Sequence, residues 1–166
     1  MNHKNLKLQD AQAFVKLHHR HSEPLKRHIF SVGAVKYPGD FELLGVVTVD
    51  RCSSAWSKRR DHVEIRRLCV KPDAPKNVAS YLISRAKDAC WAMGYNAIIT
   101  YTKPYELGSS LLATGFYVQK AKWSPGNPSH PRGLVQWCTG RGSQWIAQKQ
   151  RQSTKKLLFE IRESFE

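Results

Sequence analysis

The order of strand-like and helix-like segments predicts an α/β fold, in which a mixed, mostly antiparallel central sheet is flanked by helices. The turn at residues 37–40 joins two apolar segments and is a strong signal for an antiparallel hairpin. Residues 62–102 form a strand–helix–strand unit, whose two strands should run parallel with a right-handed crossover. A chain of 166 residues that is 41% hydrophobic can bury one core of this kind.

In the first half of the chain we expect one helix among four strands. Asp10 is a suitable N-cap for a helix that extends to about His19. The expected strands cover residues 4–8, 29–36, 42–50 and 62–70. In the strand at 62–70, strict alternation places Val63, Ile65 and Arg67 on one face. It places Glu64, Arg66 and Leu68 on the opposite face.

The second half is expected to continue with a helix at 77–93, ended by Gly94, and a buried strand at 96–102. A short helix at 108–114, closed by Gly115, precedes two strands at 116–120 and 134–138. Helical periodicity returns from about Ser143. We therefore expect residues 1–140 to form one domain, and residues 141–166 to form a basic helix that packs on the domain or extends from it.

The charge of the chain is strongly positive. Lysine and arginine number 27 against 13 acidic residues, which gives a net charge of +14 and a pI near 9.9. This excess predicts an anionic partner, with nucleic acid (DNA or tRNA) favoured, although a basic surface that only confers solubility is the simpler explanation. Basic residues cluster at Lys26-Arg27-His28, Lys58-Arg59-Arg60, Arg66-Arg67 and, near the end of the chain, Lys149, Arg151, Lys155 and Lys156.

Two expected loops combine aromatic with basic residues. Trp56 precedes Lys58, Arg59 and Arg60, and Trp123 precedes His130 and Arg132. Such aromatic rings can stack on nucleic-acid bases while the cations meet phosphates, or they can simply pack in the core.

The four cysteines form no CxxC pair, and no apolar run approaches the ~20 residues that cross a bilayer. The N-terminal residues lack the apolar segment of a signal peptide. We expect buried free thiols, a cytoplasmic protein without membrane contact, and a monomer or homodimer.

Two short segments carry a resemblance to a known family. Leu68-Cys69-Val70-Lys71-Pro72 resembles the end of the fourth strand of the GNAT (Gcn5-related N-acetyltransferase) superfamily, and Gly115-Phe116 resembles its recurrent Gly-Phe pair. The chain is more closely similar to a GNAT-like family of phages and prophages over residues 10–138, with matching segments such as His28-Ile29-Phe30-Ser31-Val32-Gly33 and Thr100-Tyr101-Thr102. The resemblance implies a GNAT fold and acyl transfer.

A fainter resemblance connects the chain to the Mom-type DNA modification enzymes of phages. The shared segments are Arg67-Leu68, Pro75-Lys76-Asn77 followed by Ser80, and Tyr101 followed by Pro104. That family has an Asp where this chain has Lys103, which argues against Mom-type chemistry. A nucleic-acid substrate remains an expectation.

The GNAT resemblance implies that acetyl-CoA, or a related acyl-CoA, binds at the end of the fourth strand and at the turn that opens the following helix, where backbone N–H groups attract anions. The corresponding residues are Leu68, Cys69, Val70, Lys76, Asn77, Val78, Ala79 and Ser80. The turn lacks the family's glycines, but Asn77 tolerates a positive φ and Ala79 is small. A plain helix N-terminus capped by Asn77 is the alternative.

Acyl transfer to an amine needs a proton acceptor, and GNAT enzymes often place a Glu on this strand. Glu64 is therefore the candidate base, with a Glu that merely pairs with Arg66 as the alternative. Arg66 or Arg67 would orient an anionic substrate through bidentate bonds. His28 and Thr102, together with Lys58, Arg59 and Arg60, complete the expected substrate-binding residues.

The general acid of the family is usually a Tyr five residues before the Phe of Gly-Phe, and this chain has Leu111 there. Ser110 and Tyr101 are the candidates that replace it, with Tyr105 also near the strand end. Either the acid is dispensable or the reaction is not standard acetyl transfer. The neighbouring histidines His18, His19, His21 and His28 do not form a zinc pattern with the cysteines, so no metal is expected.

These observations predict an acyl-CoA-dependent acyltransferase, most simply an N-acetyltransferase, that acts on an amine of an anionic substrate. The alternative from another class is a non-catalytic or Mom-like protein of the same fold that binds or modifies nucleic acid, for example as a phage anti-restriction factor.

Overall fold

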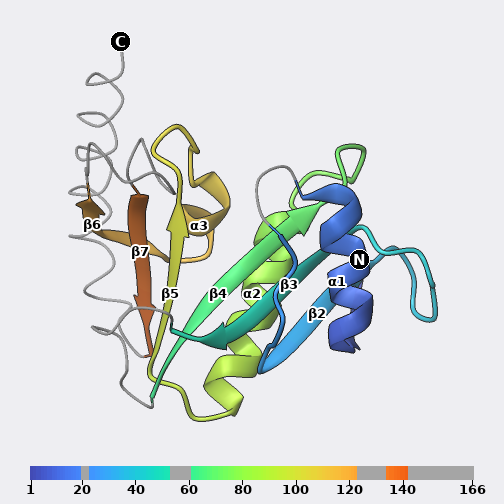
Figure 1. Ribbon diagram of the computed structural model, residues 1–166, viewed down its shortest axis with the longest axis horizontal. Coiled ribbons are helices and arrows are strands. Elements are labelled where there is room, and N and C mark those ends of the chain that lie inside the picture. The colour runs from blue at the N-terminus through green and yellow to red at the C-terminus, as the bar shows by residue number, and fades with distance from the viewer. Residues whose placement is uncertain (20–22, 53–60, 123–133, 142–166) are drawn as a thin grey trace.

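The computed structural model describes residues 1–19, 23–52, 61–122 and 134–141 (Figure 1). Within these residues the elements follow the predicted order: β1 (Asn2–Leu6), α1 (Leu8–His18), β2 (Phe30–Val35), β3 (Gly45–Arg51), β4 (His62–Val70), α2 (Val78–Ala92), β5 (Ala97–Thr102), α3 (Ser109–Ala113), β6 (Tyr117–Lys122) and β7 (Leu134–Gly140). The helix expected within residues 141–166 lies outside the described residues, apart from Arg141.

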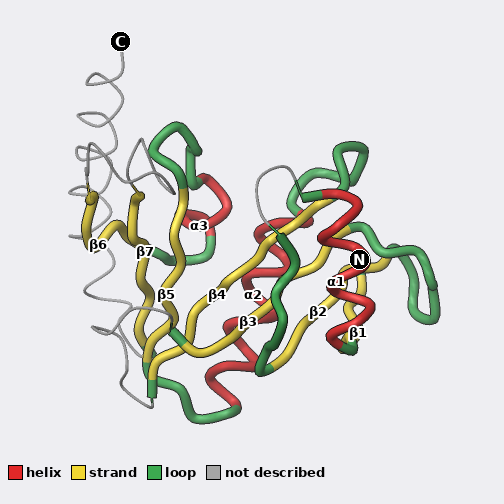
Figure 2. Tube along the Cα trace, in the orientation of Figure 1, coloured by secondary structure: helices red, strands yellow, loops and turns green. Residues whose placement is uncertain are grey.

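The strands form one seven-stranded sheet in the order β1-β2-β3-β4-β5-β7-β6 (Figure 2). Only the pairing of β4 with β5 is parallel among the strand pairs of the described chain, and the others are antiparallel. The mixed, mostly antiparallel sheet and its parallel β4–α2–β5 unit are therefore confirmed. The hairpin turn is confirmed as well, since the Tyr37 and Asp40 backbones are joined by a hydrogen bond of 3.3 Å.

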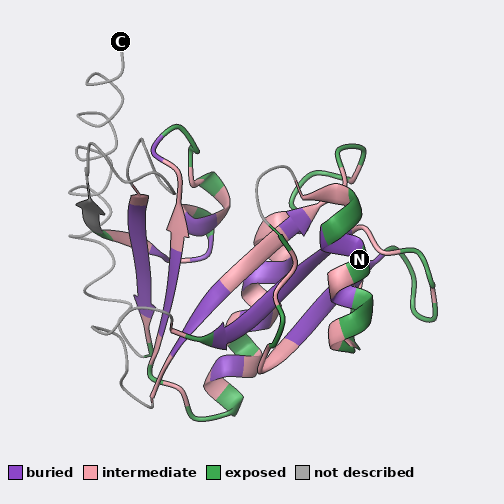
Figure 3. Ribbon diagram, viewed as in Figure 1, coloured by how far each residue is buried: buried purple, intermediate pink, exposed green. Residues whose placement is uncertain are grey.

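The two faces of the sheet are covered differently. Helix α2 packs across β2, β3 and β4 on one face, where buried residues such as Val47, Leu82 and Trp137 form the main core. Helix α1 covers the other face through a smaller cluster that includes Phe14 and Val46. Figure 3 shows that the buried residues concentrate on the central strands. The face that carries α1 is therefore only partly covered by helix among the described residues.

Two predictions about helix ends had different outcomes. Asp10 was the expected N-cap of the first helix, but α1 begins at Leu8 with Lys7 as N-cap, and Asp10 lies in the first turn. A carboxylate in the first turn still interacts favourably with the helix dipole, so Asp10 stabilises the N-terminal end of α1 although it is not the N-cap. Gly94 ends α2 as predicted, with φ of 86°.

A β-bulge in β4 changes which side chains share a face. Thr48 pairs with Arg67 and Val49 with Ile65, so Arg66 is the extra residue. The expectation from strict alternation is therefore wrong beyond Ile65. Leu68 packs with the α2-side core, whereas Arg67 takes the face of Glu64, because its strand partner Thr48 is two residues from Asp50, the partner of Glu64.

Candidate active site where two parallel strands diverge

Strands β4 and β5 pair over only four residues, from His62 opposite Ala97 to Ile65 opposite Thr100. Beyond this point β4 continues to Val70 along β3 alone, and the two strands fan apart in Figure 1. In a strand, every second residue directs its N–H and C=O to the side away from a given neighbour. The β5-facing backbone groups of residues 66–70 therefore have no ladder partner on β5.

The predicted coenzyme-binding residues Leu68, Cys69 and Val70 lie on this diverging segment. Their side chains are part of the packing, so any ligand here would meet the backbone. Cys69 is 4% exposed and packs against α1, and burial raises the pKa of its thiol to about 11. A thiol that stays protonated at neutral pH is not a nucleophile, which leaves Cys69 a packing role.

Helix α2 follows β4 after residues 71–77, and its N-terminus has an unusual geometry. Asn77, the N-cap, has φ of 71°, in the left-handed region that normally favours glycine. Its side chain makes no capping bond, and the Ser80 hydroxyl donates to the Asn77 carbonyl at 3.0 Å. Asn77 therefore does adopt the positive φ that it was expected to tolerate. It is also the N-cap, as in the alternative of a plain helix N-terminus, but its side chain makes no capping bond.

The backbone donors of this helix end are consequently open within the described part of the chain. The first intrahelical bond runs from the Tyr81 N–H to the Asn77 carbonyl. The N–H groups of Val78, Ala79 and Ser80 precede it and have no acceptor in the helix. No acidic residue lies in the first turn, and Lys76 is exposed beside it. Open donors, the helix dipole and a lysine together suit an anion.

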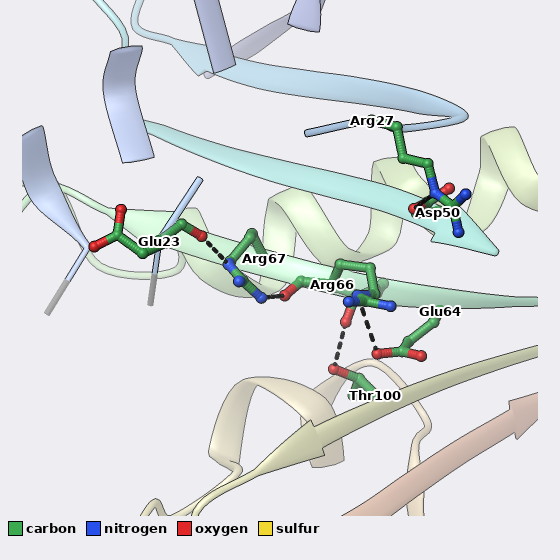
Figure 4. A network of polar contacts seen from close by, with 8 residues as sticks. Glu23, Arg27, Asp50, Glu64, Arg66, Arg67 and Thr100 are labelled. Carbon is green, nitrogen blue, oxygen red and sulfur yellow. Dashed lines mark hydrogen bonds and ion pairs between the residues drawn. The ribbon is translucent and has the colours of Figure 1, made fainter. Parts of the chain in front are cut away.

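Glu64 lies on β4 opposite Ile99, one residue before the last β4–β5 pair. It is 6% exposed, and the Arg66 Nε is 3.5 Å from its Oε1 (Figure 4). The pairing with Arg66, which was the alternative to a catalytic role, is present. It does not exclude that role, because the arginine also fixes the orientation of the carboxylate.

A second buried carboxylate was missed by the sequence analysis. Asp50 on β3 stands directly opposite Glu64 and is also 6% exposed. The Arg27 Nε approaches its Oδ2 to 3.3 Å, while the Arg27 side chain is 79% exposed. The signal was present in the sequence, since Thr48 and Asp50 alternate with core valines and so share the polar face.

Arg67 lies on the same face and holds two carbonyl groups. Its Nε donates to the Glu23 carbonyl at 2.9 Å, and its Nη1 donates to the Arg66 carbonyl at 2.7 Å (Figure 4). Burial, and after it the charge of Arg66, lowers the pKa of Arg67 from its usual value. The structure thus brings Arg67, Glu64 and Asp50 to one surface.

His28 is positioned by a chain of hydroxyl groups. The Ser31 hydroxyl donates to the Thr48 Oγ1 at 3.1 Å and lies 2.7 Å from the His28 Nδ1. These two contacts connect the His28 ring through Ser31 to Thr48 on β3. The residues from Glu23 to His28 therefore lie over the polar face formed by Thr48, Asp50 and Arg67.

The candidate general acids lie on different sides of the sheet. Tyr101 is two residues beyond Ile99, so it shares the face of Glu64. Ser110 is on α3, which packs against α2 on the opposite side. Leu111 is 6% exposed and belongs to the core, so this position offers no proton donor. Thr102 accepts a hydrogen bond from the Trp137 Nε1 at 2.8 Å, which is a packing contact.

Several predicted residues lie outside the described residues: Trp56, Lys58, Arg59, Arg60, Trp123, His21, His130 and Arg132. Among the residues that are described, no group of three or more His, Cys, Asp or Glu side chains is arranged to hold a metal ion. No helix in the same ranges has both the length and the apolar character needed to span a bilayer.

Comparison with known proteins gives structural neighbours only. No protein-family model matches the sequence, and no curated protein matches it. An IAA acetyltransferase from Bacillus cereus superimposes with a TM-score of 0.63 at 12% identity, over 84% of this chain and 98% of that one. The ribosomal-protein-S18-alanine N-acetyltransferase of Escherichia coli gives 0.62 at 10% identity, over 84% and 92%.

A third neighbour, an acetyltransferase from Bacillus subtilis solved in complex with CoA, gives a TM-score of 0.59 at 19% identity, over 84% of this chain and 97% of that one. At these identities the likeness is one of fold. The expected GNAT fold is therefore confirmed, while the phage-type and Mom-type resemblances remain predictions.

Proposed function

We propose that the protein is an acyl-CoA-dependent acyltransferase that transfers an acyl group, in the simplest case acetyl, to an amine. The observation that carries the proposal is the divergence of β4 from β5 beside the open N-terminus of α2. Solved neighbours of the same fold hold CoA or acetyl-CoA, which supports this choice of ligand.

The residues present fit such a coenzyme. The N–H groups of Val78, Ala79 and Ser80 would hold its diphosphate, with Lys76 as an added cation. The backbone groups of residues 67–70 that have no ladder partner on β5 would pair with the amides of its pantetheine arm. An acyl-CoA supplies a thioester, whose carbonyl carbon is the activated electrophile.

The chain's own side chains would manage the protons. Glu64 would accept the proton that a neutral amine gives up when it forms the amide bond. Tyr101, Ser110 or water would supply a proton to the sulfur that leaves the acyl group. Arg66 would orient Glu64, and Asp50 stands beside it on the neighbouring strand.

For the acceptor we favour an anionic molecule, with nucleic acid (DNA or tRNA) first. Its support is the net charge of +14. The acceptors named for proteins of this fold differ widely, from a ribosomal protein alanine to nourseothricin, so the fold leaves the acceptor open. A modified DNA base, as in the Mom-type resemblance, is the narrowest form of the proposal.

Calorimetry with acetyl-CoA tests the function. The wild-type protein should bind acetyl-CoA saturably, and Asn77→Asp should weaken binding by roughly 1–3 kcal/mol, because a carboxylate then faces the diphosphate. Asn5→Asp, which makes the same charge change on the exposed β1 edge, should bind as wild type does. Absence of acetyl-CoA binding would favour a non-catalytic protein that only binds nucleic acid.

A further inference from the structure

Five charged side chains meet on the sheet face opposite α2, and their charges do not cancel. Arg27 pairs with Asp50, and Arg66 pairs with Glu64. Arg67 is the fifth, and within the described residues its guanidinium has no carboxylate partner at ion-pair distance. Its two hydrogen bonds run to the Glu23 and Arg66 carbonyls, which orient the group without neutralising it.

The guanidinium of Arg67 keeps donors for a further ligand. An arginine has five N–H groups, and two of those of Arg67 reach these two carbonyls. No acceptor for the other N–H groups lies within the described part of the chain. Because Nε and one Nη are already held, the plane of the fork is set, and little side-chain entropy remains to be lost when an anion binds.

The surroundings make this charge costly until an anion arrives. Burial lowers the pKa of Arg67, and the neighbouring charge of Arg66 lowers it further. The charge of Glu64 acts in the opposite direction on this pKa, and an anion bound directly to the guanidinium would offset the cost of burial further. The pKa direction supports the geometric argument but does not replace it.

The position of Arg67 relates it to the proposed chemistry. It follows the bulge in β4 and faces the same side as Glu64, three residues earlier. At about 3.3 Å per strand residue, less the contraction of a bulge, the two side chains start roughly 7–10 Å apart. One acceptor molecule can therefore present an amine to Glu64 and an anionic group to Arg67.

We propose that Arg67 is the anion-binding residue of the acceptor site, and that the acceptor carries a phosphate or carboxylate group about this far from its reactive amine. The assignment of the site to an acceptor rests on the proposed acyl transfer, whereas the binding of an anion at Arg67 does not. A phosphate of nucleic acid and the phosphate or carboxylate of a small molecule share this chemistry.

The competing explanation is that Arg67 only ties the residues around Glu23 to β4. Site-resolved NMR of arginine Nε–H groups separates the two, because a tether does not respond to free anions. The protein is first saturated with acetyl-CoA, so that the N-terminus of α2 does not compete for the anion. Inorganic phosphate and acetate are then titrated separately while the Arg67 Nε–H signal is followed.

The Arg67 signal should shift saturably with at least one of the two anions. Phosphate affinity, measured by calorimetry on the same protein, should fall about tenfold or more in Arg67→Met and less in Arg67→Lys, which keeps the charge but loses the fork. Arg85→Met is the matched control, because Arg85 already pairs with Asp88 at 2.8 Å. The phosphate affinity of this variant should stay within about twofold of that of the wild type.

An Arg67 signal that neither anion moves would overturn the inference, and so would an Arg67→Met protein that is folded and binds phosphate as wild type does. If Arg67→Met does not fold, the wild-type shift and Arg67→Lys still decide. A short single-stranded oligonucleotide that moves the Arg67 signal and competes with phosphate would identify nucleic acid as the source of the anion. An Arg67 signal that responds to phosphate or acetate but not to the oligonucleotide would identify a small molecule as the source of the anion.

Failure of the inference and failure of the proposed function look different. If the wild-type protein does not bind acetyl-CoA but its Arg67 signal responds to anions, the proposed acyltransferase function is wrong and the anion site stands. If the protein binds acetyl-CoA but its Arg67 signal does not respond, the function stands and the anion site is wrong.

Discussion

Thr100 donates its side-chain hydroxyl to the carbonyl oxygen of Ile65 at 3.0 Å, on the last pair of residues that joins β4 to β5. The bond is buried and crosses the two strands at the point where they part (Figure 4). One residue later Arg66 bulges out of the β3–β4 ladder. The hydroxyl bond and the bulge together fix where the backbone of β4 becomes open to a ligand.

We expect Thr100→Val to lower the free energy of unfolding by about 1–3 kcal/mol, because the buried Ile65 carbonyl loses its side-chain donor. The affinity for acetyl-CoA should fall as well, since the strands would part at a less defined point. Urea unfolding and calorimetry measure the two effects. Thr139→Val is the control: Thr139 is 4% exposed, and no side-chain hydrogen bond of its hydroxyl is found among the described residues, so its change should stay within about 0.5 kcal/mol. Equal effects of both variants would contradict the role assigned to Thr100.

Glu64→Gln keeps the shape of the side chain and removes its basicity. If Glu64 accepts the proton of the amine, turnover should fall by about 10²–10⁴-fold while acetyl-CoA binding is retained. Release of free thiol from acetyl-CoA in the presence of a panel of amines measures the rate. Glu42→Gln, which changes an exposed carboxylate that contacts Lys71 at 2.7 Å, should leave the rate unchanged. A fully active Glu64→Gln enzyme, or one whose loss follows its loss of stability, would return Glu64 to a structural role.

The fold was predictable because its signals are local. Alternation, the turn at residues 37–40 and the glycines that end helices each depend on a few neighbouring residues. Within the described ranges the expected elements agree with the structure to within a few residues. The facing of Arg67 and Leu68 was not predictable. A bulge depends on the register between two strands, and a single inserted residue reverses every facing that follows it.

The site was predictable only in part for the same reason. Asn77 could be recognised because a positive φ favours few residue types, and Glu64 because its strand resembles a family. The alternation of Thr48 and Asp50 with core valines could have placed Asp50 on the polar face, but its position opposite Glu64 depends on strand pairing. The link between Ser31 and His28 likewise depends on a tertiary contact that sequence spacing does not reveal.

The loop that follows β5 is held by close packing between Gly108 and Trp137. A Cβ added to Gly108 would lie 2.3 Å from the Trp137 Cζ2, and its φ is +63°. Gly108→Ala should therefore destabilise the fold by about 3 kcal/mol or more, through overpacking added to backbone strain. Gly39→Ala is the matched comparison, because Gly39 also has a positive φ but an added Cβ would meet nothing; it should cost about 1–2 kcal/mol. Thermal unfolding of both variants checks the difference, and equal losses would mean that the Trp137 ring moves aside without cost.

The last prediction concerns the excess positive charge. Binding of a polyanion releases counterions, so the affinity for DNA or tRNA should fall linearly with salt concentration on logarithmic axes. Replacing Lys58, Arg59 and Arg60 with Ser should flatten this dependence by about one unit for each phosphate that the variant no longer binds. We expect these three to matter more than Lys155 and Lys156, because residues 53–60 connect β3 to β4 directly after Asp50 and before Glu64. Fluorescence anisotropy with labelled oligonucleotides at several salt concentrations measures both slopes. If the wild-type protein binds neither DNA nor tRNA at low salt, nucleic acid is not the acceptor, and the net charge of +14 then has the coenzyme phosphates and a small anionic acceptor as its partners.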